Sequence, residues 1–161
     1  MVDDIAQGLK DWLFAVGHVV VAGIGNPIRG DDYAGLKIAE SLQGKVSSNV
    51  CVLECETVPE SFLLDIEIFH PTHVLLVDTA VLGAQPGEAR LVDSSAIAWF
   101  SAFSSHVLPL RIFCEYVLKM TGAKVALLLI EPKNMEFGGS LSPEVQTAVD
   151  KLTGILLGLL R

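Results

Sequence analysis

Residues 18–32, HVVVAGIGNPIRGDD, contain the strand and the loop from which the fold of this chain can be predicted. The run from His18 to Gly23 is apolar at successive positions and rich in β-branched valine. Such a continuous run indicates a strand that is buried on both faces, as in parallel sheets. The loop that follows contains glycines and an Asn-Pro pair, and it ends in two adjacent aspartates, Asp31 and Asp32.

Strands and helices are predicted to alternate along the rest of the chain. We expect strands at 18–23, 49–56, 73–81, 88–92 and 124–131. Apolar residues at helical spacing predict helices at 3–16, 33–43, 62–69, 107–121 and 145–159. The strand at 88–92 should lie antiparallel at an edge, because its link from the third strand is too short for a crossover helix. This order predicts an α/β three-layer sandwich, with a twisted, mostly parallel five-stranded sheet and helices on both faces.

Length and composition restrict the possible functions. A chain of 161 residues is of ordinary size for one domain, and we expect a single domain over residues 1–161. The formal net charge of -8 disfavours attraction to nucleic acid or to anionic membranes. No apolar stretch reaches the roughly 18–20 residues of a spanning helix, and the acidic N-terminus lacks the pattern of a secretory signal. We therefore expect a cytoplasmic protein without membrane insertion, whose partner is a small molecule or a protein.

Three polar residues near strand ends form the candidate site, because ligands of open α/β sheets bind beyond the carboxyl ends of the strands. Asp32 follows the first strand, Asp78 lies near the end of the third, and His106 precedes the helix at 107–121. Asp31 or Asp32 could simply cap the next helix, and His106 could simply be hydrogen-bonded. Asp78 is harder to explain, because an ionisable group in a buried strand costs several kcal/mol unless it is paired, hydrogen-bonded or bound to metal.

Two carboxylates and an imidazole at one edge of a sheet permit two kinds of chemistry. They form a ligand set that suits a borderline divalent ion such as nickel, zinc or iron and leaves coordination positions open. Without metal, the two aspartates could share a proton as an acid/base pair. The spacing does not distinguish these alternatives, nor a resident metal from one that arrives with a substrate.

The glycines of the first loop also suggest nucleotide binding. A dinucleotide fingerprint requires G-x-G-x-x-G, and Gly23 and Gly25 match its first two glycines, whereas Ile28 stands at the third position. Glu54 or Glu56 could serve as the ribose-binding acid. Because two carboxylates at the mouth of the loop would repel phosphate, the sequence gives this interpretation little support.

Four stretches of the chain together resemble the hydrogenase maturation endopeptidases. They are GIGNPIRGDDYAG after the first strand, LLVDTAV at the end of the third, SSH before a helix, and IEP followed by a loop and LSPEV. The resemblance extends from about Val19 to Val149, so residues 1–17 are an N-terminal helical extension of the single domain. It implies the α/β fold described above and a cytoplasmic enzyme that removes a C-terminal peptide from the large subunit of nickel-iron hydrogenases.

The resemblance also implies roles for individual residues. The family's three nickel-recognising residues fall on Asp32, Asp78 and His106, and the nickel is supplied by the substrate, since cleavage follows nickel insertion. No organic cofactor is implied. The family is grouped with aspartic-type endopeptidases, so that either aspartate could activate water, or the metal could polarise the scissile carbonyl. We expect a monomer that acts on the large-subunit precursor. The loop that presents Asp32 is expected to be shaped by Gly25, Asn26 and Asp31.

The chain departs from many family members at residues 55–61, CETVPES, where a glycine pair is common. This form looks closer to the branch that serves formate-hydrogenlyase-type and related archaeal hydrogenases. Two rival functions remain. A peptidyl-tRNA-hydrolase-like esterase would also open with a strand and a G-x-x-N-P turn, but it needs a basic groove that this acidic chain does not evidently offer. A non-enzymatic module would bind a nucleotide or a partner's tail without cutting it.

Overall fold

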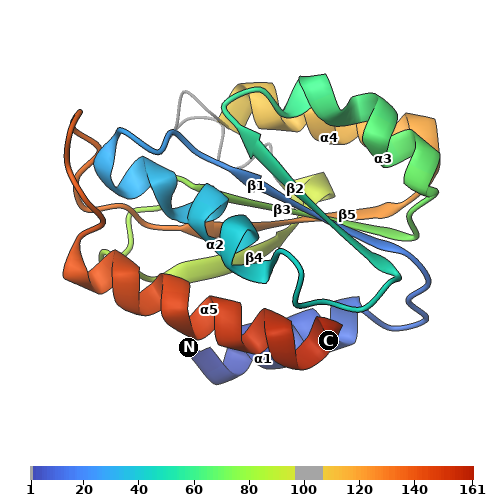
Figure 1. Cartoon of the computed structure of the whole chain (residues 1–161), viewed down its shortest axis with the longest axis horizontal. Coiled ribbons are helices and arrows are strands. Elements are labelled where there is room, and N and C mark those ends of the chain that lie inside the picture. The colour runs from blue at the N-terminus through green and yellow to red at the C-terminus, as the bar shows by residue number, and fades with distance from the viewer. Residues whose placement is uncertain (1, 97–106) are drawn as a thin grey trace.

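The structure, a computed structural model, describes residues 2–96 and 107–161 and contains a five-stranded sheet (Figure 1). The strands are β1 (Val19–Ile24), β2 (Val50–Glu56), β3 (His73–Thr79), β4 (Ala89–Asp93) and β5 (Lys124–Ile130). Their spatial order is β2-β1-β3-β5-β4. All neighbouring pairs are parallel except β4 with β5, which is antiparallel. The predicted edge strand and the mostly parallel sheet are therefore confirmed.

Helices cover both faces of this sheet, which confirms the three-layer α/β architecture (Figure 1). On one face lie α1 (Val2–Trp12), α2 (Ala34–Leu42) and α5 (Pro143–Leu160), and on the other lie α3 (Leu63–Phe69) and α4 (Val107–Thr121). Two short 3-10 helices, η1 (Gly30–Tyr33) and η2 (Pro59–Phe62), precede α2 and α3. No helix in the described part of the chain is long and apolar enough to cross a membrane.

The central strands are apolar at successive positions because each face of the sheet packs against its own layer of helices. Every residue of β1 and of β3 is buried. Val19 and Val21 join the core under α1, α2 and α5, whereas Val20 and Ala22 join the core under α3 and α4. This division follows from the two-residue period of a strand, and it accounts for the continuous valine run.

The first helix is shorter than predicted. It ends at Trp12 rather than near residue 16. Ala15 has a left-handed backbone with φ 58°, which a continuing right-handed helix cannot contain. The chain then turns through Gly17 into β1, where the Gly17 N–H donates to Thr72 Oγ1.

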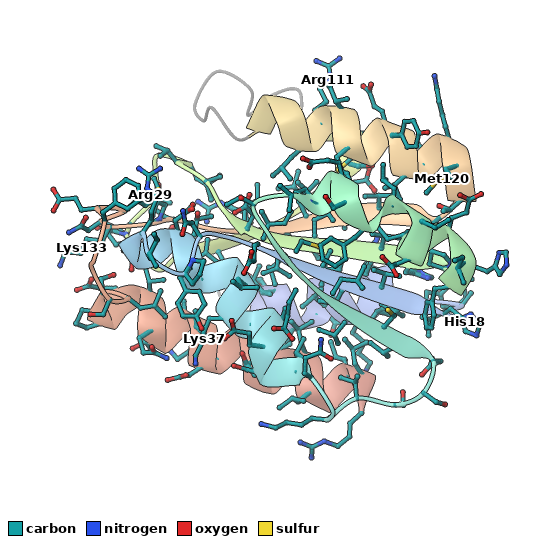
Figure 2. The ribbon with its side chains drawn as sticks, turned by 45° about the horizontal axis from the view of Figure 1, so that its top comes forward. His18, Arg29, Lys37, Arg111, Met120 and Lys133 are labelled. Carbon is teal, nitrogen blue, oxygen red and sulfur yellow. The ribbon has the colours of Figure 1, made fainter. Side chains whose placement is uncertain are left out.

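Close packing of α2 on the sheet places the segment before it at the carboxyl ends of β1 and β3. A Cβ atom on Gly35 would lie 2.2 Å from the Val77 carbonyl oxygen and 2.4 Å from that of Ile24. Only glycine allows this approach. Side chains at this carboxyl edge include Arg29 and Lys133, whereas His18 and Met120 mark the opposite edge (Figure 2).

Candidate active site at the carboxyl edge of the sheet

Thr79, the last residue of β3, connects the two aspartates of the candidate site. Its hydroxyl donates to Asp32 Oδ1 at 3.2 Å, and its backbone N–H donates to Asp78 Oδ1 at 2.8 Å. The second oxygen of Asp32 accepts the Asn26 N–H at 3.2 Å. Asp32 and Asp78 are both buried. Two carboxyl groups that lie 46 residues apart in the sequence are thus held around one threonine.

Asp78 occupies an environment that opposes ionisation. Burial raises the pKa of its carboxyl group well above the ordinary value, and the nearby Asp32 adds to this effect, whereas the Thr79 N–H opposes it. The charged form loses hydration on burial, and a neighbouring negative charge adds repulsion. In the isolated protein Asp78 therefore tends to keep its proton, as one member of an acid/base pair would.

A cavity of about 360 Å³ opens beside Asp78 between α3 and α4. Its walls are largely apolar, and the side chains that bring hydroxyl or carboxyl groups to it are Thr57, Glu60, Asp78 and Tyr116. A concave, mostly apolar pocket with a few polar groups is the usual form of a ligand site. The larger hollow, about 720 Å³ between α1, α5 and residues 86–91, contains neither Asp32 nor Asp78. The smaller cavity is therefore the candidate cleft.

Neither aspartate caps the helix that follows, so the capping interpretation of Asp31 and Asp32 is wrong. α2 begins at Ala34 after η1, and no side chain donates or accepts a capping hydrogen bond at either start. The Asp31 carboxylate is instead fully buried against residues 133–142. The two neighbouring carboxylates thus have different surroundings, one fixed to a distant loop and one beside Thr79.

Gly25 and Asn26 lie against Asp32. A Cβ atom on Gly25 would lie 2.0 Å from the Asp32 carbonyl oxygen, so that a side chain cannot be accommodated there. Asn26 donates its N–H to the Asp32 carboxylate and accepts the Ile28 N–H on its own side-chain oxygen at 3.1 Å. An Asn side chain that accepts a backbone N–H two residues on stabilises a turn.

Comparisons with known proteins show which family has this sequence and fold. The family model described as hydrogenase maturation protease (HycI) matches residues 36–159. The hydrogenase 3 maturation protease of Escherichia coli K12 is 30% identical over 131 residues, which cover 81% of this chain and 83% of that protein. The HycI protease structure from Thermococcus kodakarensis KOD1 has a TM-score of 0.88 and 31% identity, covering 95% of this chain and 98% of that one. The chain belongs to the hydrogenase maturation protease family.

The solution structure of the endopeptidase HycI from Escherichia coli is a further member with this fold, at a TM-score of 0.75 and 27% identity over 88% of this chain and 90% of that one. Membership of a protease family makes the chain a hydrolase of peptide bonds. The comparisons support neither the peptidyl-tRNA-hydrolase-like esterase nor the non-enzymatic binding module.

The ligand set predicted for this hydrogenase maturation protease is described only in part. Asp32 and Asp78 lie at the carboxyl edge, and His106 lies outside the described residues. Within residues 2–96 and 107–161, no three His, Cys, Asp or Glu side chains are arranged to hold a metal ion. The two carboxylates are suitable donors for a divalent metal, and the imidazole stays a sequence prediction.

Two buried polar residues at the ends of β3 and β5 were not predicted from the sequence. Thr79 follows Asp78 in the apolar run of β3, and a threonine in a strand carries no local signal of a polar role. Glu131 is buried after β5 and accepts the N–H groups of Leu82 and Ala84 at 3.0 and 2.7 Å. The position of Glu131 directly after a buried strand could have indicated that its carboxylate accepts hydrogen bonds, because a buried carboxylate requires partners.

Proposed function

We propose that this protease removes the C-terminal extension of a nickel-iron hydrogenase large-subunit precursor after nickel has been inserted. The observation that carries the proposal is the pair of buried carboxyl groups around Thr79, with Asp78 at the candidate cleft of a maturation protease. Two linked carboxyl groups are a recurrent arrangement for acid/base hydrolysis. They are also suitable ligands for a metal that the substrate delivers.

The environment of Asp78 supports a link between nickel and cleavage. Without a cation nearby, burial and Asp32 favour the protonated form of Asp78. A bound divalent ion is the largest local charge in such a site and reverses this preference, because carboxylate ligands bind metal in the ionised form. In our proposal, the nickel of a loaded precursor draws the Asp78 proton off and is recognised by Asp32, Asp78 and His106. A precursor without nickel would leave the pKa of Asp78 raised by burial and by Asp32.

Peptide-bond hydrolysis in this proposal uses the same carboxyl pair. One aspartate oxygen accepts a proton from water as the water oxygen attacks the scissile carbonyl carbon. The proton is then returned to the leaving nitrogen as the C–N bond breaks. One copy of the chain contains both aspartates, so we propose that the protein acts as a monomer, and we propose that it acts in the cytoplasm.

The proposal is tested by incubating the protein with a nickel-loaded precursor and with a nickel-free precursor, and by following intact mass. We expect loss of the C-terminal peptide from the loaded precursor alone. Asp32→Asn and Asp78→Asn should each slow this cleavage by about 100-fold or more, because each removes a proton-transfer group and a metal ligand.

Asp150→Asn is the matched control, since Asp150 is exposed on α5 and its carboxylate contacts only the Gln146 side chain among the described hydrogen bonds. This variant should cleave at the wild-type rate. A folded Asp78→Asn protein that also cleaves at the wild-type rate would remove the carboxyl pair from the mechanism. Cleavage of both precursors would retain the protease but exclude nickel recognition.

A further inference from the structure

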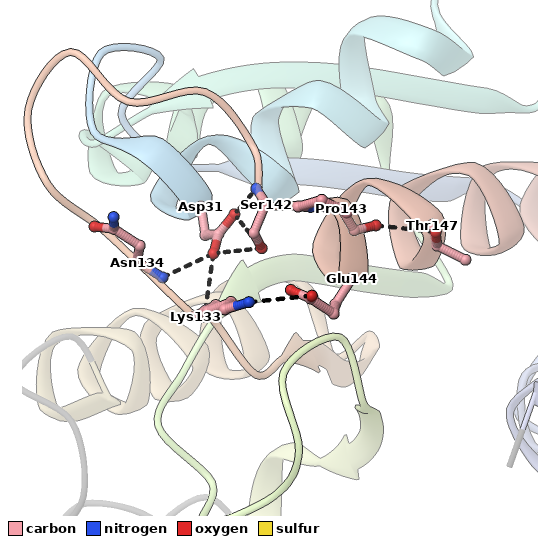
Figure 3. Close-up of polar contacts among 7 residues, drawn as sticks. All are labelled: Asp31, Lys133, Asn134, Ser142, Pro143, Glu144 and Thr147. Carbon is pink, nitrogen blue, oxygen red and sulfur yellow. Dashed lines mark hydrogen bonds and ion pairs between the residues drawn. The ribbon is translucent and has the colours of Figure 1, made fainter.

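A buried carboxylate fastens a surface loop to the segment that carries Asp32. Asp31 Oδ2 accepts the N–H groups of Lys133 and Asn134 at 2.8 and 2.9 Å (Figure 3). Its Oδ1 accepts the Ser142 N–H at 2.7 Å, and the Ser142 hydroxyl lies within 3.0 Å of both oxygens. The carboxylate thus binds both ends of the segment 133–142, which we call the clamped loop. Charge-assisted hydrogen bonds of this kind are stronger than neutral ones.

The middle of the clamped loop is joined to residues 28–30 as well. The Gly138 N–H donates to the Ile28 carbonyl at 2.8 Å, and Arg29 Nε donates to the Met135 carbonyl at 3.4 Å. The Arg29 guanidinium lies 4.9 Å from the centre of the Phe137 ring, in a cation–π contact. The two surface segments are therefore joined at the ends of the clamped loop and again near its middle.

This hydrogen-bonded pair of loops presents two large apolar side chains to solvent. Phe137 is 71% exposed and Ile28 is 58% exposed. Ile28 precedes Arg29 in the chain and Phe137 contacts it, and Arg29 lies with Lys133 at the carboxyl edge of the sheet (Figure 2). Aromatic side chains and Arg are enriched among residues that dominate protein interfaces. A loop that is ordered in advance also loses less conformational entropy when a partner binds.

We propose that Ile28 and Phe137, held by the Asp31 clamp, form a docking platform for the folded body of the large-subunit precursor. The inference rests on the proposed function. An apolar protein surface is the chemistry that these two side chains fit, and the platform is next to Asp32 in the chain. Docking there would hold a precursor close to Asp32 and Asp78 while its extension enters the cleft. Asp31 is a positioning residue in this arrangement, since it acts through the clamped loop.

The test compares kcat and KM for cleavage of the nickel-loaded precursor by Phe137→Ser and Ile28→Ser. We expect each substitution to raise KM about tenfold, as loss of an interface residue does, and to leave kcat within about twofold. Matched controls are Phe14→Ser and Ile68→Ser. Phe14 is 79% exposed and Ile68 is 65% exposed, and they lie in the α1–β1 connection and near the end of α3. Both controls should keep the wild-type KM and kcat.

The role of Asp31 is tested by a double-mutant cycle with Asp31→Asn and Phe137→Ser. If Asp31 positions the platform, Phe137→Ser should raise KM much less in the Asp31→Asn protein than in the wild type. Additive effects on KM would overturn the positioning role. Wild-type KM in Phe137→Ser and Ile28→Ser, with normal cleavage by the unmodified enzyme, would overturn the platform alone. Failure of the unmodified enzyme to cleave would overturn the proposed function and the platform with it.

Discussion

The carboxyl group of Asp78 is buried in apolar surroundings. A backbone hydrogen bond and a preference for the protonated form reduce the cost of this burial. Thr79 supplies the hydrogen bond, and burial together with Asp32 raises the pKa of Asp78 well above its ordinary value of 3.8. From about pH 4 up to the folded-state pKa, the folded protein holds a proton that the unfolded chain releases. The free energy of unfolding should therefore fall as pH rises through this window, by up to about 1.4 kcal/mol per pH unit.

Asp78→Asn should remove this contribution, because an amide does not ionise and its oxygen can still accept the Thr79 N–H. We expect the variant to gain stability over the wild type as pH rises above about 4, with the gain levelling off above the folded-state pKa. Urea denaturation of both metal-free proteins across this pH range measures the difference. A difference that is constant with pH would show that the Asp78 pKa is the same in the folded and unfolded chains.

The contact between α1 and the start of β3 has the opposite pH dependence. His73 is buried there, and the Trp12 ring packs on its imidazole with centroids 5.0 Å apart. Burial lowers the pKa of His73 below its ordinary value of 6.5, and Lys124 on the neighbouring strand adds to this effect, whereas the backbone of Trp12 and Phe14 partly opposes it. The unfolded chain then binds the proton more readily, so stability is lost as pH falls below about 6.5.

Substitution of His73 tests whether protonation of its imidazole causes this loss of stability at low pH. The quantity to compare is the free energy of unfolding of the wild type minus that of His73→Gln. This difference should be smaller at pH 5 than at pH 7, because only the wild type has this imidazole to protonate. Urea denaturation at the two pH values provides the measurement. A difference that does not change would show that protonation of His73 does not oppose packing of α1 on β3.

The elements also show which features a sequence can predict. The valine run of β1 predicted a strand buried on both faces, and the short link before β4 predicted an antiparallel edge strand. Both are local properties of the chain. The partners of Asp31 lie 102 to 111 residues away, and most are backbone N–H groups that any residue possesses. Their meeting depends on the folded sheet, so the sequence suggested a loop-shaping role for Asp31 without its partners, and the local alternative of helix capping is wrong.

The candidate site also has one feature that the sequence predicts and one that it does not predict. Asp78 was singled out because a carboxyl group in an apolar strand conflicts with its surroundings, and such a conflict is visible in one segment. The link from Thr79 to Asp32 joins the end of β3 to η1 and was not visible in either segment. The nickel-recognising roles of Asp32, Asp78 and His106 stay predictions until the precursor assay is made.

At the scale of the whole molecule, the residues that the structure describes pack into two apolar cores, one on each face of the sheet. Ile38 of α2 is fully buried in one core, and Ile66 of α3 is fully buried in the other. Because β1, β3 and β5 contribute residues to both cores, loss of packing on one face should weaken the same cooperative unit as loss on the other. We expect Ile38→Val and Ile66→Val each to lower the free energy of unfolding by about 1 kcal/mol.

The double variant should lose about 2 kcal/mol, since the two side chains share no core and distant substitutions are usually additive. Ile68→Val is the control, because Ile68 lies on the same helix as Ile66 but is exposed, and it should change stability by less than about 0.5 kcal/mol. Denaturant unfolding followed by far-ultraviolet circular dichroism and by fluorescence measures these values. A single transition with the same midpoint by both probes would support one cooperative unit. Separate midpoints in the double variant would instead mean that the layers on the two faces of the sheet unfold independently.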